Sequence, residues 1–277
     1  ARFANLILRN FKGGVQLKNS TLMLKDLSTK TNVGDLKLNA MYHCNDKNGA
    51  DAGIDVQGSN VDITNLVNTM PEIDSLVPML RSFQGVVTVD LTAKTSLDSV
   101  YNLLLPSLSA ATVIRGDSLV LMDGETFSEV AKLLMFKKKT KNLIDNISVE
   151  LLLNNNEMQV LPFMVEMDKY KVAVGGQNSL DMNFNYHVSV LKSPLPTKLG
   201  VNVSGTLDDM KIRLAKCKYK DEKTVTRKGQ FSNGGVNLRS ELQNNLRAAI
   251  RNAVNSYATE QKERMSAVTE EKKKKQE

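Results

Sequence analysis

The 277-residue chain has no tryptophan, two cysteines and two histidines. Cys44 and Cys217 lie far apart and neither belongs to a CxxC pair, so neither a disulfide framework nor a zinc site is supported. We expect two free buried thiols, with a single bridge as the alternative. His187 falls on the polar side of a predicted strand, so a plain surface role is preferred for it. Neither His187 nor His43 is expected to act in catalysis or metal binding.

Long apolar runs and nucleotide-binding loops are also missing. No apolar stretch approaches the roughly eighteen residues that a membrane span needs, and the glycines form neither GxGxxG nor a Walker loop. The acidic residues Asp117, Asp123 and Glu125 do not have EF-hand spacing. We therefore expect a protein that is not an enzyme and has no cofactor and no metal. The chain begins at Ala1 without an initiator methionine, which suggests a piece of a longer protein.

The net charge of +7 is concentrated near the C-terminus. From Lys211 to Glu277 there are seventeen Lys or Arg and eight Asp or Glu, whereas the first 210 residues have twenty and twenty-two. A basic tail without tryptophan is a poor match for a nucleic-acid surface, so no nucleic-acid partner is expected. A solvated tail is the preferred interpretation, and contact with anionic lipid headgroups is the alternative.

What the chain does contain is strand periodicity. Residues 180–190 alternate without a break, which predicts a strand of roughly 36 Å with one apolar and one solvent-facing side. Residues 1–60 predict a meander of hairpins, and residues 141–216 predict long antiparallel strands with a turn about every ten residues. Breaks are expected at Gly13-Gly14, 115–118 and Gly175-Gly176.

Helical patterns interrupt the strands in three places. Asp62 is expected to cap a helical stretch, Ser96 and Asp98 to open another that runs to Leu104, and a Thr126–Glu129 capping box to start a helix over 126–136. The segments 151–153 and 160–165 are apolar on both sides, so each side of those strands must be covered. The helix at 126–136 is the expected cover of one side.

After residue 216 the strand pattern ends. We divide the chain into a β domain over 1–216, with parts 1–60, 61–140 and 141–216, a basic linker over 217–236, and a C-terminal helix and charged tail over 237–277. The apolar stripe over 238–257 must pack on something. Docking on the sheet or pairing with a second copy is preferred to lying on a membrane.

Several of these segments resemble the C-terminal region of AsmA-family proteins, particularly those of Bacteroidetes, over roughly residues 60–216. The resemblance lies in strand-and-turn positions rather than in catalytic signatures. The segments that carry it are Ile114–Leu119, Glu125–Phe136, Ile147–Glu150, Pro162-Phe163, Asp168–Tyr170 with Gly175, Leu180-Asp181, Ser193–Pro196 and Gly200–Gly205.

The resemblance implies an elongated, curved antiparallel sheet with a hydrophobic groove. Together with the helical patterns above, the expected fold is mainly β (α+β), with a few short helices covering part of one face and a C-terminal helix. The resemblance also implies a periplasmic protein, anchored to the inner membrane by an N-terminal segment, that acts in outer-membrane biogenesis and phospholipid transport. Phospholipid is the expected partner, with the inner-membrane surface and outer-membrane assembly proteins as further partners.

The alternating and doubly apolar strands supply the residues expected to line such a groove. Burial of a phospholipid acyl chain is favourable by about 0.8 kcal/mol of free energy for each CH₂ that leaves water. A surface of Leu, Val and Met side chains can bury such a chain. Taken singly, each residue fits ordinary sheet core better than lipid contact. A scaffold for outer-membrane protein assembly, using strand edges and the helix at 238–257, is the alternative function. The predicted lipid-contacting residues are Leu151, Leu153, Val160, Phe163, Met182, Phe184 and Tyr186.

Overall fold

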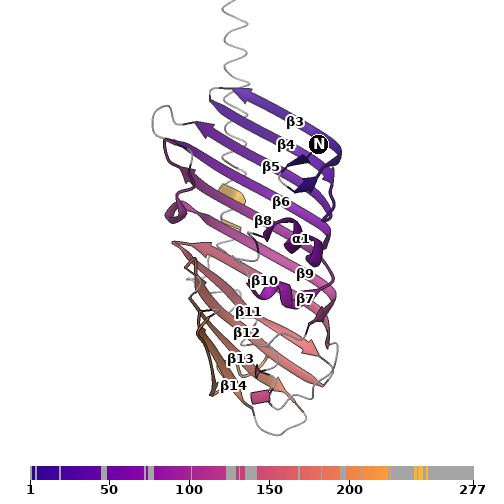
Figure 1. Cartoon of the computed structure of the whole chain (residues 1–277), viewed down its shortest axis with the longest axis vertical. Helices are drawn as coiled ribbons and strands as arrows, with labels where there is room; N and C mark the ends of the chain where they lie inside the picture. The colour runs from indigo at the N-terminus through magenta and orange to yellow at the C-terminus, as the bar shows by residue number, and fades with distance from the viewer. Residues whose placement is uncertain are drawn as a thin grey trace, which may run out of the picture.

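The chain folds as a mainly β protein around one large antiparallel sheet of thirteen strands (Figure 1). The computed structural model describes residues 2–3, 5–18, 20–44, 49–71, 73, 78–100, 102–122, 129–130, 132–134, 142–167, 169–181, 183–193, 198–206, 208–223, 225, 240–241, 243–245 and 248. Each described strand of the main path pairs with its neighbour in sequence, so the predicted series of hairpins is confirmed.

The strands follow one another across the sheet in chain order. The first half contains β3 (Arg9–Lys18), β4 (Thr21–Lys30), β5 (Asp35–Cys44), β6 (Ala50–Asp62), β8 (Val86–Leu97) and β9 (Ser109–Leu121). The second half contains β10 (Asn142–Asn154), β11 (Glu157–Met167), β12 (Tyr170–Ser179), β13 (Phe184–Lys192), β14 (Gly200–Gly205) and β15 (Met210–Ala215). The short β7 (Phe83–Gln84) pairs with β9, and β1 (Arg2–Phe3) and β2 (Leu6–Ile7) form a separate pair.

Bulges keep the apolar side chains on one face of these long strands. The register shifts between Leu24 and Leu27 in β4 and between Gly58 and Val61 in β6. Asp26 and Asn60, inside those two shifts, have left-handed backbones with φ of 48° and 54°. An extra residue of this kind offsets the alternation by one position, which returns the buried Leu27 and Val61 to the apolar side.

Short helices cover part of that apolar side. The predicted cap at Asp62 is confirmed, because its carboxylate accepts a 2.7 Å hydrogen bond from the backbone N–H of Asn65 at the start of α1 (Ile63–Thr69). Helix η1 (Pro78–Ser82) follows it. Residues 129–130 and 132–133 are helical, and Val130 and Leu134 are buried in the same core as Ile63 and Val67. Thr126, the predicted cap, lies outside the described residues.

Three predicted breaks are wrong, because strands run through them. Residues 13–14 lie inside β3, residues 115–118 inside β9, and Gly175-Gly176 inside β12. In β12 the reason is close packing rather than a turn. A Cβ on Gly175 would lie 2.7 Å from the Tyr219 hydroxyl, so the glycine gives room to another segment within a continuous strand.

Two other predictions need correction. The helix expected from Ser96 to Leu104 is instead the end of β8 and a loop, because the Asp98 carboxylate accepts from the N–H groups of Val100 and Asn102 and closes a turn. The strand expected over 180–190 begins only at Phe184. Leu180 and Asn183 belong to the hairpin turn, where the N–H of Ser179 donates to the carbonyl of Asn183.

The predicted C-terminal helix lies mostly outside the described residues. Its described part is helical at 240–241, 243–245 and 248, and lies behind the sheet in Figure 1, on the side opposite α1. There the Gln243 side-chain amide donates a 3.1 Å hydrogen bond to the Asp90 carboxylate of β8. Cys44 and Cys217 are free, as predicted, but they are half-buried and not buried.

Candidate functional site

The side chains that cross-strand pairing brings onto one face form two long apolar rows. The first row reads Leu27, Leu38, Val56, Leu91, Thr112, Leu151, Val160, Gly176, Tyr186, Val203 and Ile212, from β4 to β15. The second reads Val15, Leu24, Ala40, Ile54, Ala93, Ala110, Leu153, Met158, Asn178, Phe184, Gly205 and Met210, from β3 to β15. We call the face that carries these rows the apolar face.

The six predicted lipid-contacting residues that the structure describes all belong to the apolar face. Leu151, Val160 and Tyr186 lie in the first row, and Leu153 and Phe184 in the second. Phe163 lies in a parallel row of direct cross-strand partners, Val174, Val188, Val201 and Leu214. Met182 lies outside the described residues. The structure thus places six predicted residues, which are distant in sequence, on one face of the sheet.

Burial divides this face into two parts. Leu151, Leu153 and Val160 in β10 and β11 are buried, whereas Phe163, Phe184 and Tyr186 are half-buried and pack against the main core. Toward the N-terminus the rows become more accessible. In β5, β6 and β8 the row residues Leu38, Ala40, Val56 and Leu91 are half-buried, and Ile54 is 36% exposed. Apart from the edge strand β3, where Val15 is 63% exposed, the accessible apolar surface is therefore concentrated in β5–β8, a part that the residue predictions missed.

Two polar side chains on this face satisfy each other. The Tyr186 hydroxyl donates a 2.7 Å hydrogen bond to the side-chain oxygen of Asn178, which is buried. Burial raises the pKa of Tyr186 to about 12. The Phe184 and Tyr186 rings lie 6.2 Å apart, centre to centre. Around Phe184 and Tyr186, the apolar face thus contains one hydrogen-bonded polar pair among apolar side chains.

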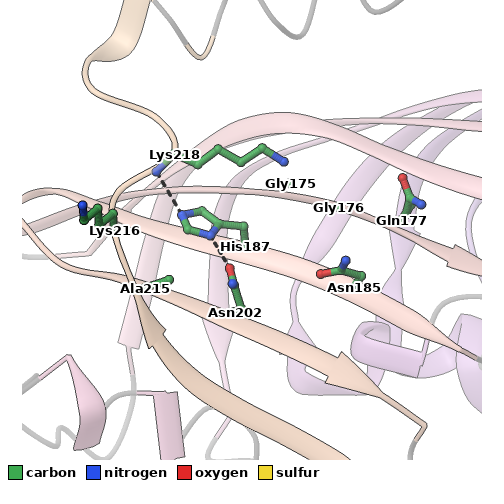
Figure 2. A pocket seen from close by; sticks show the side chains of 9 residues that line it. All are labelled: Gly175, Gly176, Gln177, Asn185, His187, Asn202, Ala215, Lys216 and Lys218. Atoms are coloured by element: carbon green, nitrogen blue, oxygen red, sulfur yellow. Dashed lines mark hydrogen bonds between the residues drawn. The ribbon is translucent and has the colours of Figure 1, made fainter.

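The opposite, polar face carries a pocket of about 380 Å³ (Figure 2). Strands β12, β13 and β14 form its floor, and the chain after β15 forms its rim. None of its nine described lining residues is acidic. They are Gly175, Gly176, Gln177, Asn185, His187, Asn202, Ala215, Lys216 and Lys218.

His187 is the central wall of this pocket, and the prediction of a surface role for it is wrong. It is only 7% exposed, its Nδ1 lies 2.5 Å from Asn202 Oδ1, and its Nε2 accepts a 3.1 Å hydrogen bond from the N–H of Lys218. Since Nε2 accepts a hydrogen bond from the backbone N–H of Lys218, the ring proton is assigned to Nδ1, which donates a hydrogen bond to Asn202 Oδ1. The ring is a structural bridge between two strands and the following chain.

Ser189 completes this bridge. Its hydroxyl oxygen is 2.8 Å from His187 Nε2 and accepts hydrogen bonds from the N–H groups of Lys218 (2.9 Å) and Tyr219 (3.1 Å). A serine beside a histidine could suggest a nucleophile and its base. Here Ser189 is fully buried and its oxygen is already occupied by two donors, so the pair holds the chain in place instead of facing a substrate.

The chain after β15 therefore folds back over the polar face, and we call residues 216–223 and 225 the strap. Tyr219 and Val225 are buried with Ala173, and the Tyr219 ring lies 5.9 Å from the His187 ring in an edge-on arrangement. Lys171 of β12 pairs with both Glu166 and Glu222. The hydrogen bond to Glu166 and, second, the one to Glu222 raise the pKa of the Lys171 ammonium group. Sequence composition predicted a linker here and missed this packing; the apolar Tyr219 and Val225 were the available signal.

The described residues contain no group of three or more metal-ligating side chains, and none of their helices is long and apolar enough to cross a membrane. Comparison with known proteins finds no family model, curated protein or solved structure that matches the chain.

Proposed function

We propose that this chain is a non-enzymatic lipid-handling domain that holds acyl chains on its apolar face. The observation that carries the proposal is the pair of apolar rows, which cross nearly the whole sheet and contain only three residues with a polar side-chain group, Thr112, Asn178 and Tyr186. Twelve strands lie on the main path, because β7 is off it, and eleven spacings of about 4.8 Å give a row about 50 Å long. Such a length exceeds that of a single acyl chain.

The energetics favour this use of the surface. Each CH₂ that leaves water contributes about 0.8 kcal/mol, so one acyl chain offsets on the order of 10 kcal/mol. The accessible stretch of β5–β8 offers aliphatic side chains of different sizes, which suits chains of different length. Transfer of phospholipid between membranes, as expected from the AsmA resemblance, is the process in which we place this activity.

Native mass spectrometry with solvent extraction tests the proposal on protein purified from a Gram-negative host. The test variant carries Ile54→Asp and Val56→Asp, which place two charges on the accessible apolar face. The matched control carries Gln57→Asp and Ser59→Asp, two exposed positions of the same strand, one of which, Gln57, pairs with Asp90 on the polar face. Phospholipid should accompany the wild type and the control, and fall at least about tenfold in the test variant.

A folded test variant that keeps its phospholipid would contradict the proposal. A wild type that is itself free of lipid would favour a second function, that of a scaffold which binds partner strands. That function is favoured by β3, which forms one edge of the main sheet and exposes Phe11, Val15 and Leu17 by 51%, 63% and 75%. An edge with apolar side chains can add a strand from another protein.

A further inference from the structure

The loop between β8 and β9 exposes an unusual group of apolar side chains. Val100 is 70% exposed, and Leu103, Leu104 and Leu105 are 46%, 42% and 45% exposed. The loop ends in η2 (Leu105–Ser107) and projects at the left border of the sheet in Figure 1. Four large aliphatic side chains this close together in water are costly, and such patches mark interaction sites.

The loop is held in one shape by its own polar groups. Asp98 accepts hydrogen bonds from the N–H groups of Val100 (2.9 Å) and Asn102 (2.8 Å), and the latter contact lowers the pKa of its carboxyl. The N–H of Leu104 donates to the carbonyl of Ser96 at 3.0 Å. The exposure of the leucines is thus built into the loop.

Ser107 closes the other side of the loop. Its hydroxyl donates to the Leu104 carbonyl at 2.7 Å and accepts from the N–H of Ser96 at 2.8 Å. The N–H groups of Ser107 and Leu108 donate to the carbonyls of Leu104 and Leu105. Because these backbone groups are paired within the loop, it can enter an apolar medium without leaving them unpaired.

We propose that this loop inserts its apolar side chains into the surface of a lipid bilayer. The proposal goes beyond the lipid-handling function, since it concerns the membrane on which the protein docks and does not require lipid on the apolar face. The sequence from Ser99 to Ile114 contains no charged residue, so insertion is driven by the hydrophobic effect and not by anionic headgroups.

A bilayer fits this loop better than a protein groove does. The exposed side chains are aliphatic, whereas protein interfaces favour aromatic residues and arginine as anchors. A fluid bilayer needs only apolar area, presented by a loop that pairs several of its own backbone groups. The basic strap and tail lie in a different part of the sequence. Because their charge is positive, binding through them would depend on salt and on anionic lipid.

The absence of tryptophan gives a direct test. Leu104→Trp makes the loop residue the single tryptophan of the full chain, and Leu143→Trp does so for a 52% exposed control beside Val120, at the opposite end of β9 from the loop. With vesicles of pure phosphatidylcholine, emission from position 104 should shift to the blue and be quenched by brominated lipid, while position 143 stays unchanged. No shift at 104, or equal shifts at both positions, would overturn the proposal.

A second variant measures the loop without a probe. Leu103→Ser with Leu104→Ser should lower binding to the same vesicles at least about tenfold, with no loss of binding by the wild type at high salt. Binding that needs anionic lipid and disappears in salt would assign the contact to the basic residues and overturn the proposal. Lipid co-purification is measured separately, so a failure here is distinct from a failure of the lipid-handling function.

Discussion

Tyr186 is the residue whose ionisation the fold controls most clearly. Its hydroxyl donates to Asn178 on the apolar face, and partial burial of the side chain raises its pKa from the ordinary value near 10 to about 12. The folded protein therefore keeps the phenol proton at pH values where the unfolded chain loses it. This contribution to stability is complete below pH 10 and decreases as the pH rises from about 10 to 12.

We accordingly expect Tyr186 to lower the free energy of unfolding by on the order of 2 kcal/mol across this alkaline range. Tyr219, whose pKa burial also raises, acts in the same direction. Tyr186→Phe should reduce the fall and cost about 1 kcal/mol at neutral pH, because Asn178 loses its donor. Urea unfolding at several pH values measures both effects. An unchanged alkaline slope in the variant would show that Tyr186 is not the group responsible.

His187 shows what single-residue reasoning from sequence could not supply. Alternation correctly placed it on the polar side of its strand, but polar does not mean exposed. The strap that covers it begins some thirty residues later, and its contacts with Ser189 and Lys218 exist only after β14 and β15 have paired. A sequence pattern predicts the face of the strand on which a side chain lies, but it does not predict which other segment packs on that face.

At the scale of elements, the strap depends on a space that a glycine provides. A Cβ at Gly175 would lie 2.7 Å from the Tyr219 hydroxyl and 3.1 Å from Pro162 Cα. Gly175→Ala should therefore displace the strap and destabilise its docking by about 1–3 kcal/mol. Faster trypsin cleavage at Lys218, Lys220 or Lys223 reports the displacement.

A double variant separates this effect from general strand damage. Tyr219→Phe removes the atom that meets the new methyl group, so Gly175→Ala with Tyr219→Phe should be cleaved more slowly than the sum of the single changes requires. Strictly additive effects would mean that the alanine acts on β12 itself. The same contact explains why the sequence suggested a break at Gly175: glycine marks turns and close approaches alike.

Elements with a local cause were the predictable ones. Asp62 caps α1 through its own side chain, and the turn over 154–156 uses Asn155 and Asn156 in left-handed conformations, so both could be read from adjacent residues. The prediction of a helix after Asp98 was wrong because an Asp carboxylate can either cap a helix or close a turn. The contact that decides between them comes from Ser107, whose hydroxyl accepts from the N–H of Ser96 in β8. The apolar face was predicted from β10–β13, but its accessible part lies in β5–β8.

At the scale of the whole molecule, the sheet is assembled from local hairpins, and its two halves differ in cover. Each main-path strand contacts mainly its sequence neighbours, as in a repeat protein whose parts can open separately. The large core joins α1, Val130 and Leu134 mainly to strands from β9 onward, whereas most apolar residues of β5 are only half-buried. Burial therefore stabilises the C-terminal half more than the N-terminal half.

Hydrogen exchange should reveal this difference as a gradient along the chain. We expect amides of β3–β5 to exchange through openings that cost a few kcal/mol less than those of β10–β13, because fewer apolar contacts are broken when the former separate. Mass-spectrometric exchange at mild denaturant concentrations measures the two regions in one sample. Equal protection throughout the sheet would mean that the halves unfold as one cooperative unit.

If acyl chains occupy the accessible apolar surface, added phospholipid should raise protection in β5–β8 and leave β10–β13 unchanged, because ligand binding stabilises the segments it contacts.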